Sequence, residues 1–220
     1  MIVTELINMK DIPVFTTQYG VASLFLREIP YRQRAHIKIQ SSLEPEKLLA
    51  ECVDFCKACG AEWIDAAGHE YLEKYPLITV LYAMQCDREF LGETDACLFP
   101  VTEETVGQWL KIYNERMANI PNAAYMDSKD GKELLQKGDG YFVHKDGELL
   151  GIGKAAGDFL DAVIAVKPGM GETVVHALCS ILTDDTVRLM VAGANERAVR
   201  LYERLGFMKT KELSRWYRVL

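Results

Sequence analysis

The sequence lacks any apolar run of the roughly 20 residues that a membrane-spanning helix needs, although 49% of its 220 residues are hydrophobic. It also lacks a basic excess, because 25 Lys and Arg stand against 32 Asp and Glu, which gives a net charge of −7. Nucleic-acid binding needs a basic face, so we expect neither a nucleic-acid nor a membrane partner. Residues 1–6 carry no basic segment and no long apolar segment, which predicts no signal peptide and a cytoplasmic protein.

Metal-binding patterns are also scarce. None of the four histidines has a second ligand at metal-binding spacing: His36, His69, His144 and His176. Six cysteines, in a chain of this length without a secretion signal, are expected to be reduced thiols. We therefore expect no metal ion.

One group of cysteines follows a known spacing. Cys52, Cys56 and Cys59 have the C-x3-C-x2-C spacing of radical S-adenosylmethionine iron–sulfur proteins. They also fall at positions i, i+4 and i+7 of an amphipathic helical stretch, where Cys behaves as a small buried hydrophobe. The motif usually has an aromatic residue before its third Cys, and here Ala58 takes that place. The pattern favours a core stripe, and an iron–sulfur cluster remains the alternative.

A strand, a tight turn and a helix follow one another in the C-terminal half. Residues 159–166 predict a strand that is apolar except at Asp161, and residues 172–182 predict a helix. The Lys-Pro-Gly-Met-Gly turn at 167–171 lets a phosphate approach the backbone, and the free N–H groups of the following helix favour an anion. The chain has neither a Walker A string nor a Rossmann Gly-x-Gly-x-x-Gly at this turn.

The most specific string of the chain is Asn-Glu-Arg-Ala-Val-Arg-Leu-Tyr-Glu-Arg-Leu-Gly-Phe at residues 195–207. Asn195 predicts a helix N-cap, and Gly206 predicts the left-handed residue that ends the helix. Between them, apolar residues recur at helical spacing. An amphipathic helix of this kind fits many α/β proteins, so its periodicity alone does not identify a function.

This string resembles the last helix of the GNAT N-acetyltransferases, and the upstream turn, with Val166-Lys167-Pro168 before a Gly-x-Gly, is similar to the acetyl-CoA loop of that family. The family loop usually also carries an Arg or Gln, which is missing here, and Glu172 adds a negative charge. The resemblance covers residues 98–220. It implies an acyl-CoA-dependent N-acetyltransferase that moves an acetyl group from acetyl-CoA to a primary amine of a small molecule or peptide by direct attack.

The resemblance also assigns roles by position. Tyr202 would be the general acid toward the thiolate of coenzyme A, and Asn195 would bond the pantetheine arm or order the approach of the helix. Backbone groups of three strand residues would pair with that arm: Ile164, Ala165 and Val166. Backbone N–H groups of the turn and the first helical turn would hold the pyrophosphate, and Gly171 would leave it room: Gly169, Met170, Gly171, Glu172 and Thr173.

The acceptor amine must lose a proton before it attacks, and a carboxylate can accept that proton. Asp161 is the first candidate, because a lone acid in an apolar strand needs a reason. Asp158 lies beside the same strand. His144 and Glu148 are weaker candidates, since both lie near a hairpin turn at Asp146-Gly147.

The N-terminal half echoes the same order of elements. A helix ending near Cys59, a strand at 61–66, a short helical piece at 68–75 and a strand at 77–84 recur as helix, strand, helix and final strand after residue 172. We therefore expect an α/β (α+β) chain of two GNAT-like units, each a mixed, largely antiparallel sheet flanked by helices. Residues 1–95 would form a degenerate unit that binds no acetyl-CoA, and residues 98–220 a complete unit.

Two alternatives stay open from the sequence. The missing Arg or Gln and the presence of Glu172 also fit a catalytically weak or inactive GNAT-fold module that binds CoA or another ligand. The chain can act as a monomer or as a homodimer, and its sequence does not identify the acceptor amine.

Overall fold

The computed structural model describes residues 13–220, so the signal-peptide expectation, which rests on residues 1–6, lies outside the described part. The chain divides into two compact units. Unit 1 comprises residues 1–80 and 214–220, and unit 2 comprises residues 81–213. Within the described part, no helix combines the length and the apolarity needed to cross a bilayer.

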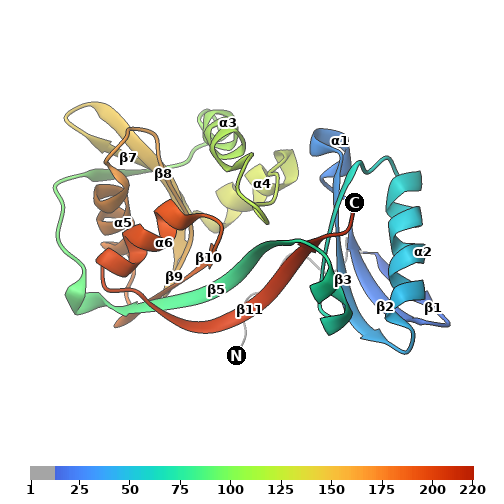
Figure 1. Ribbon diagram of the computed structural model, residues 1–220. Coiled ribbons are helices and arrows are strands. Elements are labelled where there is room, and N and C mark those ends of the chain that lie inside the picture. The colour runs from blue at the N-terminus through green and yellow to red at the C-terminus, as the bar shows by residue number, and fades with distance from the viewer. Residues whose placement is uncertain (1–12) are drawn as a thin grey trace. The chain divides into compact units, whose positions relative to one another are not determined.

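In unit 1, one long helix packs on one face of a mixed sheet (Figure 1). The strand order is β1-β2-β3-β4-β11, in which β3 and β4 are parallel and the other neighbours are antiparallel. The long helix α2 places four side chains in the core: Leu48, Leu49, Cys52 and Cys56. The elements are β1 (Val14–Thr17), β2 (Gly20–Phe25), α1 (Ile29–Arg32), β3 (Arg34–Ser42), α2 (Pro45–Ala58), β4 (Trp63–Ala67), the 3-10 helix η2 (Glu70–Lys74), and the ends of β5 (Leu77–Asp87) and β11 (Met208–Arg218).

In unit 2, helices cover both faces of a second mixed sheet. Its order is β5-β10-β9-β8-β7-β6, in which only β9 and β10 are parallel. One core lies under α5 and α6, and the other lies under α3 and α4. The elements are the 3-10 helix η3 (Arg88–Phe90), β6 (Cys97–Pro100), α3 (Val106–Met117), α4 (Ser128–Lys137), β7 (Gly140–Lys145), β8 (Glu148–Ala156), β9 (Phe159–Ala165), α5 (Gly171–Cys179), β10 (Thr186–Ala192) and α6 (Glu196–Arg204).

Two glycines of β8 allow α5 to lie very close to the sheet. A Cβ atom on Gly153 would lie 2.2 Å from Leu178 Cδ1, and one on Gly151 would lie 2.6 Å from Val174 Cγ2. Those distances are far below van der Waals contact, so a side chain at either position would push the helix away. The pair therefore fixes the height of α5 above β8.

The two units repeat one order of elements, as the sequence echo predicted. Apart from the short helix α1 between β2 and β3, three antiparallel strands, a helix, a parallel strand, a short helix and a last strand occur as β1-β2-β3-α2-β4-η2-β5 and again as β7-β8-β9-α5-β10-α6-β11. The last strand of each copy completes the sheet of the other unit. Residues 81–87 of β5 pair with β10 in unit 2, and Tyr217 and Arg218 of β11 pair with β4 in unit 1.

This exchange of strands changes where the chain divides. The sequence pattern placed the division between residues 95 and 98, whereas the contacts assign residues 81–95 to unit 2 and residues 214–220 to unit 1. The segment 86–96, which lies at the expected boundary, ends β5, forms η3 and packs within unit 2. Long-range strand pairing carries no local sequence signal, which is why the pattern missed it.

The other differences are small. Helix α3 begins at Val106 with Thr105 as its N-cap residue, because residues 103–105 form a preceding turn. The helix expected over 172–182 is α5, which begins one residue earlier and ends at Cys179. The hairpin at Asp146-Gly147 has positive φ at both residues, 52° and 78°, as a type I′ turn requires.

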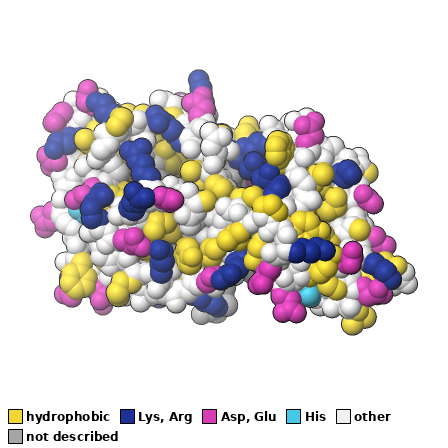
Figure 2. All heavy atoms as spheres, viewed as in Figure 1, with side chains coloured by type: hydrophobic (Ala, Val, Ile, Leu, Met, Phe, Trp, Pro, Cys, Tyr) yellow, Lys and Arg dark blue, Asp and Glu magenta, His cyan; other side chains and the backbone are white. Residues whose placement is uncertain are grey.

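On the face shown in Figure 2, Lys and Arg side chains are interspersed with Asp and Glu side chains. Mixed charge of this kind keeps a protein surface soluble and does not concentrate a field of one sign. This face of the described residues therefore carries no broad basic surface.

Candidate functional site

The parallel strands β9 and β10 of unit 2 separate soon after they meet. They pair only at Phe159 with Arg188 and at Leu160 with Leu189, and β10 continues against β5 alone. In unit 1 the equivalent parallel strands, β3 and β4, stay paired at five successive positions. Among residues 13–220, unit 2 alone therefore has a parallel strand pair that opens and leaves a backbone edge without a ladder partner.

A β-bulge lies where the two strands separate. Lys154 of β8 pairs with Ala162 and Ala155 pairs with Leu160, so Asp161 is the extra residue of β9. The bulge changes which face the following side chains occupy. Leu160 packs in the core under α5 and α6, whereas Ala162 packs in the core under α3 and α4.

The direction of the β9 backbone beyond the bulge follows from one hydrogen bond. The N–H of Val166 donates to the carbonyl oxygen of Leu150 across 2.8 Å, and Ile164 pairs with Ile152. Because alternate residues of an antiparallel ladder face opposite neighbours, Val166 and Ile164 are directed toward β8. Of the three residues expected to pair with a pantetheine arm, Ala165 is the one whose N–H and C=O point toward the opening between β9 and β10. The N–H and C=O of Val163 point the same way.

The turn after β9 leads into an uncapped helix. Gly169 adopts φ +84°, a left-handed conformation that suits glycine, and the N–H of Met170 donates to Lys167 O at 3.3 Å. The N-cap residue of α5, Met170, makes no side-chain capping bond, unlike the capped helices α4 and α6. Within the described residues, no acceptor is found for the first-turn N–H groups of Gly171, Glu172 and Thr173.

Gly171 has a packing role that the sequence did not indicate. A Cβ atom at this position would lie 2.8 Å from Leu201 Cδ2, so the missing side chain makes room for α6. The space it leaves was expected to serve a pyrophosphate. In the structure, the group nearest to the position of the missing Cβ atom is the Leu201 side chain of α6.

The charges around the turn come from three elements. The ammonium of Lys167 forms an ion pair with Glu148, and Glu172 lies in the first turn of α5. Arg116, in the last turn of α3, donates from Nη2 to the carbonyl oxygen of Val166 at 2.9 Å. Sequence reasoning missed Arg116, because 50 residues separate it from the turn and no motif connects them.

The helix of the most specific string forms as predicted. The side chain of Asn195 accepts a hydrogen bond from the N–H of Ala198 at 3.3 Å, which makes it the N-cap, and Gly206 has φ +91°. Tyr202 is 7% exposed, and its ring lies 5.6 Å from that of Phe207 in an edge-on arrangement. Burial, with a smaller effect from Cys179, raises the pKa of Tyr202, so its hydroxyl keeps its proton at neutral pH.

The expected proton acceptor, Asp161, has a half-exposed side chain that forms an ion pair with Lys154. The same ammonium lies 3.7 Å from Asp139, a residue that the sequence did not single out. Asp139 is 8% exposed, its Oδ1 atom has no hydrogen-bond partner within the described structure, and burial raises its pKa. A buried acid at the junction of α4 and β7 has no sequence signature.

The other three candidates for the proton acceptor contact residues other than Asp161. Asp158 pairs with Arg188 at 3.0 Å, and Glu148 pairs with Lys167. The ring of His144 packs 5.2 Å from the ring of Phe99. None of these contacts brings the three residues to Asp161.

The cysteine stripe packs into the core of unit 1. Cys52 and Cys56 are fully buried, and burial raises their pKa values to about 12 and about 11, so both remain thiols. Cys59 is exposed. The burial of Cys52 and Cys56 supports the core stripe over the iron–sulfur alternative for these two residues, and Cys59 is not part of the stripe.

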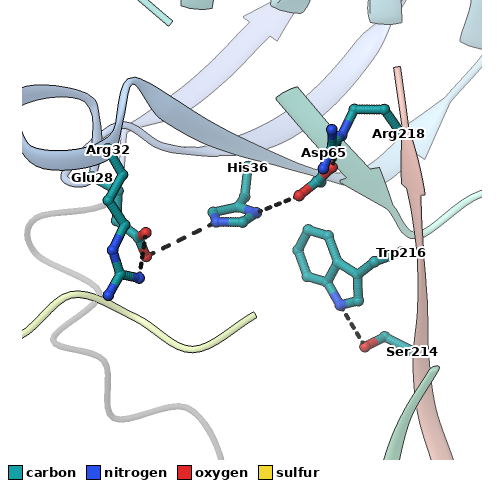
Figure 3. Close-up of polar contacts among 7 residues, drawn as sticks. All are labelled: Glu28, Arg32, His36, Asp65, Ser214, Trp216 and Arg218. Atoms are coloured by element: carbon teal, nitrogen blue, oxygen red, sulfur yellow. Dashed lines mark hydrogen bonds and ion pairs between the residues drawn. The ribbon is translucent and has the colours of Figure 1, made fainter. Parts of the chain in front are cut away.

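Unit 1 holds a separate buried polar cluster, which Figure 3 shows. His36 of β3 lies between two carboxylates, with Nε2 3.9 Å from Glu28 and Nδ1 3.9 Å from Asp65. Arg32 pairs with Glu28, and Arg218 Nε donates to Asp65 at 2.5 Å. The Trp216 ring also packs against the imidazole in a T-shaped arrangement, with 5.6 Å between the ring centroids.

The cations of this cluster decide the charge of His36. Burial lowers its pKa, Glu28 and Asp65 raise it, and Arg34 and Arg218 lower it again. The net effect is a lowered pKa, so His36 is neutral at pH 7. The cluster has no sequence signature, because its members come from three strands, a helix and a loop.

Comparison with known proteins shows the fold but not a close relative. No family model matches the chain, and no curated protein matches it. A functionally unknown conserved protein from Staphylococcus epidermidis matches with a TM-score of 0.60 and 13% identity, covering 94% of this chain and 93% of that chain.

Two acetyltransferase structures are also similar. A GCN5-related N-acetyltransferase from Kribbella flavida has a TM-score of 0.54 and 11% identity, with 91% of this chain and 56% of that chain covered. A GNAT-family acetyltransferase from Colwellia psychrerythraea has a TM-score of 0.50 and 13% identity, with 93% and 84% covered. Together with the repeated order of elements, these matches show that the chain has the fold of the GNAT N-acetyltransferases.

Proposed function

We propose that unit 2 is an acyl-CoA-dependent N-acetyltransferase that acetylates a primary amine of a small molecule or peptide. The observation that carries the proposal is the opening between β9 and β10, which leads to the uncapped N-terminus of α5. An extended arm can add to the free edge at Val163 and Ala165 like another strand. Phosphates can accept from the N–H groups of Gly171, Glu172 and Thr173.

Acetyl-CoA would supply an activated thioester, and the residues of this chain would orient it and move protons. Tyr202 holds a proton on its hydroxyl, as a general acid for a sulfur leaving group must. Asp161 lies at the bulge where the strands separate and would accept the proton of the amine after releasing Lys154. Asn195 would act through its cap, which sets the start of α6.

Unit 1 is proposed to bind no acetyl-CoA. Its parallel strands β3 and β4 are paired throughout, so they leave no edge for a pantetheine arm. Helix α2 begins with Pro45, which has no N–H, and has Glu46 in its first turn. A negative charge and a missing donor both disfavour a phosphate at that helix end.

One set of observations favours the alternative of a weak or inactive CoA-binding module. Glu172 opposes a pyrophosphate, Asp161 is already paired with Lys154, and Tyr202 is only 7% exposed. A module of this kind would bind CoA or an acylated ligand through the same opening and would transfer no acyl group.

Two assays separate these functions. Thermal unfolding with acetyl-CoA should show stabilisation, since a ligand that binds only the native state raises the midpoint. Thiol release is then followed with a panel of amines, using Asp161→Asn as the test variant and Asp158→Asn as the matched control. Stabilisation with thiol release supports the enzyme, stabilisation without release supports the module, and no stabilisation by any acyl-CoA rejects both.

A further inference from the structure

The last turn of α3 brings a cation to the turn that follows β9. The guanidinium of Arg116 donates one hydrogen bond to the carbonyl oxygen of Val166, and its side chain is exposed. Within residues 13–220, no carboxylate forms an ion pair with it. Arginine has five N–H donors, so at least four remain for a ligand.

The charge balance of the turn depends on this residue. Lys167 is neutralised by Glu148, and Glu172 then leaves one negative charge beside the N–H groups of α5. Arg116, which reaches the turn from α3, brings the sum of these formal charges back to zero. Without it, an incoming phosphate group would meet a net negative charge.

We propose that Arg116 binds the phosphate groups of the acyl-CoA, in place of the Arg or Gln that the turn itself lacks. The inference rests on the proposed function, since it assumes that acyl-CoA enters the opening between β9 and β10. The bond to Val166 holds the guanidinium at the turn before the ligand arrives. A planar guanidinium can then engage phosphate oxygens in pairs, which a lysine ammonium cannot do.

The proposal explains why a turn without its own cation can hold an anion. The helix dipole and N–H groups of α5 approach from one side, and Arg116 approaches from α3 on the other. Val166 is directed toward β8, so its carbonyl is not needed by an arm that pairs with Ala165. Arg116 and the pantetheine arm can therefore occupy the site together.

Isothermal titration of the full chain tests this, with CoA, dephospho-CoA and pantetheine as the titrants. We expect Arg116→Gln to weaken CoA binding about tenfold and to leave pantetheine binding unchanged, because pantetheine has no phosphate. Arg116→Lys should recover only part of the loss. The matched control is Lys111→Gln, which removes an exposed charge from α3 whose ion-pair partner, Glu115, lies on the same helix.

The outcomes separate the two proposals. If the loss persists with dephospho-CoA, Arg116 binds the pyrophosphate, and if it disappears, Arg116 binds the 3′-phosphate; both results support the proposal. Equal CoA affinity in wild type and Arg116→Gln overturns the role of Arg116 while the proposed function stands. Absence of CoA binding in the wild type rejects the proposed function, and the role of Arg116 falls with it.

Discussion

The substitution Gly171→Ala tests how the start of α5 is held. The new Cβ atom would lie 2.8 Å from Leu201 Cδ2, about 1 Å inside ordinary contact. Overpacking costs about 1–3 kcal/mol. The opposing atom is the end of a partly exposed side chain that can rotate, so we expect a loss near the lower limit, about 1 kcal/mol.

A loss of this size should lower the melting temperature by roughly 2–4 °C in a chain of this length. Urea unfolding of four proteins measures it: wild type, Gly171→Ala, Leu201→Ala and the double variant. Leu201→Ala removes the atom that the new methyl group meets. The double variant should therefore have the same free energy of unfolding as Leu201→Ala, within about 0.5 kcal/mol.

The result that would refute the reasoning is a full loss of about 1 kcal/mol from Gly171→Ala in the Leu201→Ala background. Titration of the same four proteins with acetyl-CoA tests whether Gly171 also serves ligand binding. If Gly171→Ala weakens binding only when Leu201 is present, the glycine serves α6. If the weakening persists without Leu201, the glycine also leaves room for the ligand, as the sequence suggested.

Three further predictions concern other parts of the molecule. Tyr202→Phe should lower turnover about 100-fold or more with little change in acetyl-CoA affinity, because it removes only the proton donor; unchanged turnover in stopped-flow thiol release would remove that role. His36 has a folded-state pKa below its ordinary 6.5, so the unfolded chain binds the proton more tightly, and stability should fall as the pH drops below 6.5. His36→Gln should flatten that part of the pH profile measured by urea unfolding, and an unchanged slope would contradict the buried neutral imidazole. Fragment 98–220 lacks β5, the partner of β10, so it should be insoluble alone and become soluble when co-expressed with 1–95; a folded fragment by itself would contradict the strand exchange.

Features set by neighbouring residues could be predicted from the sequence. Asn195 caps α6, Gly206 ends it, and Asp146-Gly147 turns the hairpin, because each of these depends on backbone conformations within a few residues. The helical spacing correctly predicted that Cys52 and Cys56 of α2 are core residues, whereas Cys59 follows the helix and is exposed. The repeated order of elements could also be recognised, since the order of helices and strands follows directly from the sequence pattern.

Features that join distant segments could not be predicted. The contact of Arg116 with Val166 spans 50 residues, and the exchange of β5 and β11 depends on pairing across more than 100. The bulge at Asp161 depends on the register with β8, which a lone acid in an apolar strand does not specify. The sequence singled out Asp161 correctly as unusual, but its register and its partner, Lys154, appear only in the folded chain.

Hydrogen exchange with and without acetyl-CoA tests the central claim most directly, because it reports backbone groups rather than activity. We predict that the ligand slows exchange at the N–H groups of Val163 and Ala165 and at residues 171–173. The parallel pair β3 and β4 in unit 1 should show no change. Protection confined to unit 1, or no change at the opening between β9 and β10 at saturating acetyl-CoA, would contradict the account.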